Sequence, residues 1–122
     1  MRSQRGSVSV LLAAGILIVL VFVLGVTDLG RVLIARSKAR TAADAAALAA
    51  ADELAMPSGA DPGGLAAEYA ARNGATLTAC TCAVGTFEAD VMVQVTTGDL
   101  LLFPGARVVV ARARAVVDLP SG

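Results

Sequence analysis

The sequence of 122 residues contains no histidine and no tryptophan, and it has only two cysteines. Without histidine there is no imidazole base, and two cysteines alone are too few for a structural zinc site. The ten acidic residues form no paired arrangement in a recognisable motif, so the roles that a catalytic site must fill lack candidates. We therefore expect that the protein is not an enzyme and that it binds no metal and no cofactor.

Neither positive nor negative charge is in excess, because ten Lys and Arg residues balance ten Asp and Glu residues. A nucleic-acid partner calls for a basic surface, which this balance does not provide. We expect neither a nucleic acid nor a small-molecule substrate. Hydrophobic residues make up 57% of the chain, yet aromatic residues are only 3%. The hydrophobic core that any domain of this chain forms by itself should thus be small, and other proteins are expected as partners.

Charged residues are missing altogether from Gly6 through Thr27. As a helix these 22 residues would reach about 33 Å, enough to cross a hydrocarbon core of about 30 Å. A cleaved secretory signal would have a shorter apolar region and a small-residue cleavage site, so this alternative is less favoured. We predict a short basic leader over residues 1–6 and a transmembrane helix from Ser7 to Thr27, with the lipid bilayer as a partner.

The helix is predicted to continue beyond the span, because no proline or glycine occurs from Arg31 to Ala55 and alanine dominates the segment. Pro57 and Gly59 then end the helix. We expect one helix from about Val8 to about Ala55, of which residues 28–55 lie outside the membrane, followed by a linker over 56–64.

The remaining sequence predicts a small α+β domain over residues 65–118 and a tail over 119–122. Asp61-Pro62 is a helix start and Asn73-Gly74 a helix stop, with Leu65, Tyr69 and Arg72 expected on the inner or rim face of the helix between them. Three alternating segments indicate antiparallel strands, at 75–84, 87–97 and 106–118. In the last of them the Ala and Val face is expected to be the covered one, since arginine is seldom buried unpaired. The apolar connection "GDLLLFPG" at 98–105 is either a core plug or an exposed contact.

Two parts of the helical segment resemble a known family. The exit from the span is Asp28-Leu29-Gly30-Arg31, and the run "TAADAAALA" that follows contains Asp44. Together they resemble the N-terminal segment of TadE/TadG-like proteins of the Flp (tight adherence) pilus-assembly system. The size of the chain and its ending "VARARAVVD" are similar to the short actinobacterial TadE-like proteins. The resemblance implies a pilin-like fold.

The resemblance also implies a function in the cell envelope. It predicts a non-enzymatic minor component, or an assembly accessory, of a surface filament or secretion apparatus, with other pilin-like or Tad assembly proteins as partners. One alternative is a single-span membrane anchor whose domain binds an unrelated envelope partner. Another is a thiol-redox protein that uses Cys80 and Cys82, which would require a reactive cysteine of low pKa.

Cleavage of the leader after Gly6 is an open question. Tad prepilins have a glycine at the cleavage site and a glutamate at the fifth mature position. Cleavage after Gly6 would place Leu11 there, and no acidic residue precedes Asp28. Both a processed chain and a retained leader with Arg2 and Arg5 therefore remain alternatives.

Orientation in the membrane is predicted differently by two arguments. Arg2 and Arg5 precede the span, whereas four basic residues follow it, so a bare charge count favours a cytoplasmic C-terminal side. The resemblance implies the reverse. We follow the resemblance and expect a single-pass protein of the cytoplasmic membrane, with its N-terminus inside and its C-terminal domain outside.

Alanines gather on one side of the predicted helix beyond the span, and this face has two interpretations. Either the sheet of the same chain packs there, or the face docks a neighbouring pilin-like subunit through close backbone approach. In the second interpretation the candidate assembly face consists of Ala39, Ala42, Ala43, Ala46, Ala49 and Ala50.

The two cysteines and Asp28 complete the candidate sites. Cys80 and Cys82 lie on the same face of a predicted strand, and two buried thiols are expected there, with redox pairing or a cross-link to a partner as alternatives. Asp28 is expected to be an interfacial helix residue that pairs with Arg31 at i,i+3 spacing.

Overall fold

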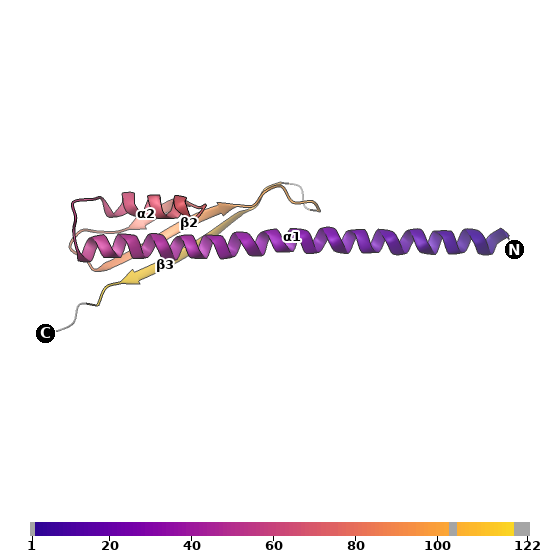
Figure 1. The fold of residues 1–122 in the computed structure, drawn as a ribbon, viewed down its shortest axis with the longest axis horizontal. Helices are drawn as coiled ribbons and strands as arrows, with labels where there is room; N and C mark the ends of the chain where they lie inside the picture. The colour runs from indigo at the N-terminus through magenta and orange to yellow at the C-terminus, as the bar shows by residue number, and fades with distance from the viewer. Residues whose placement is uncertain (1, 103–104, 119–122) are drawn as a thin grey trace.

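A single long helix runs through the computed structural model, which describes residues 2–102 and 105–118 (Figure 1). Helix α1 (Arg2–Ala55) has 54 residues, which corresponds to a length of about 80 Å. Every residue from 5 to 23 is exposed, whereas buried positions recur from Asp28 onward. Figure 1 accordingly shows the N-terminal half of α1 projecting from an α/β domain that packs against the other half. The prediction of one continuous helix ending at Ala55 is confirmed, and the helix begins earlier than Val8.

The turn after α1 is held by a carboxylate near the end of the helix. Glu53 is 8% exposed, and its Oε1 accepts hydrogen bonds from the backbone nitrogens of Ser58 at 2.7 Å and Ala60 at 3.1 Å. Its Oε2 accepts another from the Ser58 hydroxyl at 2.8 Å. These bonds, led by the one from the Ser58 hydroxyl, lower the pKa of Glu53 from its ordinary value of 4.5. The charged form of Glu53 therefore fastens the linker to α1.

Acidification is expected to weaken this turn. Because the folded-state pKa of Glu53 is lowered, its contribution to stability is present above pH 4.5 and is lost as the pH falls through the folded value. We predict that Glu53→Gln flattens the acid side of the curve of unfolding midpoint against pH. Asp52→Asn removes the same charge from an exposed neighbour and should leave the curve unchanged. An unaltered acid limb in Glu53→Gln would contradict this role.

Helix α2 (Pro62–Arg72) packs on α1 through small side chains. Asp61 is its N-cap, as predicted, and accepts a hydrogen bond from the backbone nitrogen of Gly64 at 3.0 Å. The buried residues of α2 are Pro62, Ala66 and Ala70. The expected inner or rim face is therefore only partly confirmed: Leu65 is partly buried, whereas Arg72 is exposed and Tyr69 is 38% exposed. The alanine surface of α1 favours small residues on α2, because they let the two backbones approach closely.

The sheet has three antiparallel strands in the order β1 (Thr76–Thr81), β2 (Glu88–Thr96) and β3 (Val108–Val116). Its inner face contacts both helices: β2 and β3 lie against α1, and β1 contacts α2. In β2 the inward residues Val91 and Val93 are fully buried. The predicted α+β class is confirmed, and so is the covered Ala and Val face of β3, whose arginines point outward.

Gly74, which follows α2, adopts a backbone conformation that favours glycine. Its φ is +76°, and an added Cβ would lie 3.1 Å from Cδ of Lys38 on α1. We predict that Gly74→Ala lowers the free energy of unfolding by about 1–2 kcal/mol, the cost of a left-handed residue with a side chain. Gly63→Ala is the matched control. Gly63 is helical and its added Cβ would meet only ordinary contacts from 3.7 Å, so this change should stabilise by about 0.5–1 kcal/mol. Denaturant unfolding of the two variants measures the contrast, and equal effects would contradict it.

Candidate functional site

The alanine face of α1 lies inside the chain's own core. Ala39, Ala42, Ala43, Ala46 and Ala50 are all 0% exposed, and Ala49 is partly exposed. Helix α2 and strands β2 and β3 pack on this side of α1. The proposed docking of a neighbouring subunit on these alanines is therefore corrected, because the space is already filled by the chain itself. An alanine face gives the same helical-wheel pattern in both cases, so the sequence could not distinguish them.

Asp28 makes the longest-range polar contact of α1. It is 3% exposed, and its Oδ1 and Oδ2 accept hydrogen bonds from the backbone nitrogens of Leu101 and Leu102, both at 2.7 Å. Both donors belong to the connection between β2 and β3, residues 97–107, here called the β2–β3 loop. The carboxylate thus fixes the loop on α1 at the point where the charge-free segment ends.

Two further contacts hold the loop at its base. The guanidinium Nη1 of Arg31 donates to the backbone carbonyl of Asp99. Thr97 and Arg107 are joined by a bond from the Thr97 nitrogen to the Arg107 carbonyl at 2.8 Å and by one from the Arg107 nitrogen to the Thr97 hydroxyl at 3.0 Å. Asp28 and Arg31 thus both hold the loop, which differs from the predicted pairing between them.

The loop places apolar side chains against the exposed half of α1. Leu100 is buried, whereas Leu101 is 53% and Leu102 is 37% exposed. An added Cβ on Gly25 would lie 3.5 Å from Cδ1 of Leu102, so the loop reaches a position before Asp28 in the helix. In Figure 1 the connection from β2 extends beyond the sheet along α1. Leu102 and one side of α1 enclose a shallow apolar hollow of about 290 Å³, lined by Val21, Phe22, Gly25, Val26, Leu29 and Leu102. Of the apolar loop predicted at 98–105, positions 103–104 lie outside the described residues.

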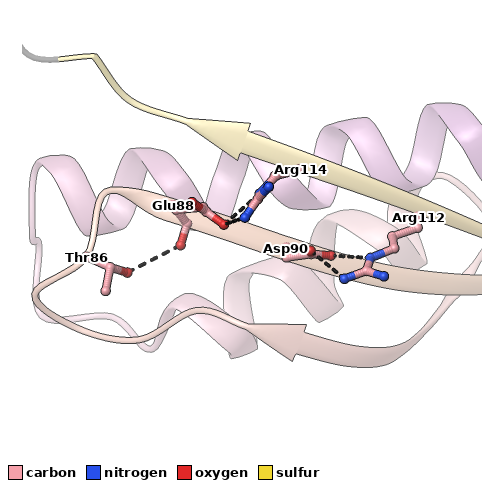
Figure 2. A network of polar contacts seen from close by, with 5 residues as sticks. All are labelled: Thr86, Glu88, Asp90, Arg112 and Arg114. Carbon is pink, nitrogen blue, oxygen red and sulfur yellow. Dashed lines mark hydrogen bonds and ion pairs between the residues drawn. The ribbon is translucent and has the colours of Figure 1, made fainter.

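The outer face of the sheet carries ion pairs between β2 and β3 (Figure 2). Arg112 donates from Nε and Nη2 to the two carboxylate oxygens of Asp90 at 2.8 and 2.7 Å, and Arg114 pairs with Glu88. The hydrogen bonds from Arg112 lower the pKa of Asp90, and the same contact raises the pKa of Arg112. Both arginine side chains are largely exposed, so these pairs fix strand register more than they stabilise the fold.

Cys80 and Cys82 form a disulfide at the end of β1. Both residues are partly buried against the core. The expectation of two buried free thiols is therefore wrong. The sequence placed both side chains on one strand face, but Cys82 lies just beyond the last residue of β1, where the ladder no longer fixes an extended backbone.

The other family-motif residues lie on exposed parts of α1. Leu29 is 58% exposed, Gly30 has open space where a Cβ would be, and Asp44 faces away from the core. Gly6 is an exposed position within α1. Within residues 2–102 and 105–118, no cluster of three or more Cys, Asp or Glu residues could hold a metal ion.

The fold by itself defines a class of protein. One helix, α1, is long and apolar enough to cross a membrane, judged by length and composition. It joins a small α/β domain that covers only its second half. This architecture is that of a single-pass membrane protein with one domain on one side.

Comparison with protein families then finds a similarity in the helical segment. Residues 6–53 match the family model described as putative Flp pilus-assembly TadE/G-like. Over this segment the chain is similar to TadE/G-like pilus-assembly proteins, in agreement with the resemblance seen in its sequence. The matched residues lie within α1 and precede α2 and the sheet. No curated protein and no solved structure matches the chain.

Proposed function

We propose that this chain is a non-enzymatic, pilin-like minor component or accessory of Flp/Tad pilus assembly or of a related secretion system. In this proposal residues 7–27 cross the cytoplasmic membrane and the α/β domain lies outside. The observation that carries it is the division of α1 into an exposed apolar half and a half packed in its own domain. The family match supports the assembly role.

The disulfide supports the proposed orientation. Disulfides persist in oxidising compartments and are rare in the cytosol, so the Cys80–Cys82 bond favours an α/β domain outside the cytoplasm. The basic residues after Asp28 argue for the opposite orientation. One of them, Arg31, donates to the β2–β3 loop, which gives it a role within the domain.

The orientation is testable at Val84, which is 84% exposed on the α/β domain. We predict that Val84→Cys, in a Cys80→Ala and Cys82→Ala background, reacts with a membrane-impermeant maleimide on intact cells from which any outer barrier has been removed. Arg5→Cys in the same background, in the first turns of α1, is the matched control and should react only after lysis. Reaction of position 84 only after lysis would overturn the orientation and agree with the charge count.

The packing of the core determines which surfaces remain available for partners. Because the buried alanines of α1 are unavailable, contacts to other assembly proteins are proposed to involve the exposed half of α1. Around Gly15 this half has a second shallow apolar hollow of about 420 Å³, lined by Leu11, Leu12, Gly15, Ile16, Val19 and Leu20. Glycine lets helices approach closely within a membrane, so this position suits contact with another span.

Photo-crosslinking in cells that build the filament tests the assembly role. A photoreactive residue at Ile16 should crosslink to another pilin-like or Tad assembly protein, and the product should be enriched in filament fractions over other membrane fractions. The same photoreactive residue placed at Leu48 reports whether contacts are restricted to the apolar half. Leu48 is also exposed, but it lies in the half of α1 that packs in the α/β domain. Normal filament formation in cells lacking the chain, with crosslinks only to unrelated envelope proteins, would favour the binding-module alternative.

A further inference from the structure

The β2–β3 loop lies beside the segment that is proposed to cross the membrane. We infer that this loop is a second membrane contact, in which Leu101 and Leu102 enter the surface of the bilayer next to α1. The inference rests on the proposed span and goes beyond the proposed function, since it assigns a lipid-binding element to the α/β domain itself.

Position along α1 is the first argument. Leu102 lies against Gly25, which precedes the last residue of the proposed span, Thr27. Its side chain completes the hollow that is otherwise lined by residues of α1 from Val21 to Leu29. The apolar surface of the loop is thus continuous with the exposed apolar surface of α1. A bilayer that covers Val21 and Phe22 would also meet the loop.

The polarity of the loop is the second argument. An unsatisfied backbone N–H group is costly in hydrocarbon, so an irregular loop is normally excluded from it. Here Asp28 accepts from the nitrogens of both Leu101 and Leu102. The loop therefore presents the Leu101 side chain outward and holds that of Leu102 beside α1, while the adjacent backbone N–H groups are satisfied by α1. A loop that only crossed through water would not need this arrangement, because water would satisfy the same groups.

Charge around the loop is the third argument. Arg31 and Arg107 lie at the loop base, on the side away from the span, and Lys38 lines an adjacent hollow with Arg31. On going from the membrane span toward the domain, the leucine side chains are therefore met first and the basic side chains second. This order matches a bilayer surface, where apolar side chains enter the acyl region and Lys or Arg side chains reach the headgroups. A protein partner would not require it.

Tryptophan fluorescence can test this contact directly, because the chain has no tryptophan of its own. The full chain would be reconstituted into nanodiscs of phosphatidylcholine and phosphatidylglycerol, with one tryptophan at Leu101, Ile16 or Val110. Ile16 reports on the span. Val110 on β3 is 57% exposed, close to the 53% of Leu101, and is the matched control for the preference of tryptophan for interfaces.

Leu101→Trp is expected to be quenched several-fold more than Val110→Trp by lipids with a nitroxide near the headgroup, and several-fold less by aqueous iodide. Ile16→Trp should be quenched by nitroxides deep in the acyl chains. Equal quenching at Leu101 and Val110 would overturn the loop contact while leaving the span intact. Failure at Ile16 would overturn the span itself. If Leu101→Trp is shielded from iodide but unquenched by lipid nitroxides, a protein surface covers the loop and the lipid assignment is wrong.

Discussion

Ala46→Arg is expected to unfold the α/β domain without preventing insertion of the span. Ala46 is 0% exposed on the side of α1 that packs against the rest of the domain. An arginine there has no space and would bring an unpaired charge into the core, at a cost of about 4 kcal/mol or more. A small domain is stable by only about 5–15 kcal/mol in total. The apolar segment before Asp28 is untouched, so membrane fractionation should remain normal.

Limited proteolysis of the membrane-bound chain measures this effect. The control is Leu48→Arg, two residues further along the same helix, where the wild-type side chain is 65% exposed. We expect rapid cleavage within the α/β domain in Ala46→Arg and wild-type resistance in Leu48→Arg. A resistant Ala46→Arg chain that has lost its crosslinks to partners would show instead that this face serves assembly.

Local sequence signals predicted most of the fold because the physics behind them is local. The absence of proline and glycine after Arg31 predicted an uninterrupted α1, and Asp61-Pro62 predicted the start of α2. Alternation predicted which side of β3 is covered. Each of these rules depends on neighbours within a few residues, and the chain follows them.

Predictions that depended on distant contacts were less successful. Asp28 was paired with Arg31 by helical spacing, but its carboxylate binds amides that lie 73 and 74 residues away. No local rule relates those positions. The sequence offered two signals: a carboxylate at the end of a run without charged residues, and an apolar loop whose position relative to the helix was not predicted. The alanine face was ambiguous for a similar reason, since the pattern does not tell which surface covers it.

The contact between Asp28 and the loop can be tested by a nearly isosteric change. In Asp28→Asn the side chain keeps its shape, but its nitrogen cannot accept a hydrogen bond, so one of the two loop amides loses its partner. Hydrogen bonds to a charged group contribute about 1.5–3 kcal/mol, and leaving a buried donor unsatisfied adds to the loss. We therefore expect local opening of the loop to become about 10- to 100-fold more frequent.

Amide hydrogen exchange of the full chain in nanodiscs measures this opening residue by residue. The amides of Leu101 and Leu102 should exchange about 10- to 100-fold faster in Asp28→Asn, whereas the amide of Thr97, bonded to the Arg107 carbonyl, should be much less affected. Asp99→Asn is the matched control. Asp99 takes part in the loop contact through its backbone carbonyl, so losing its side-chain charge should leave both leucine amides protected. Unchanged exchange at Leu101 and Leu102 in Asp28→Asn would show that the loop is held on α1 by its leucine side chains and not by the carboxylate.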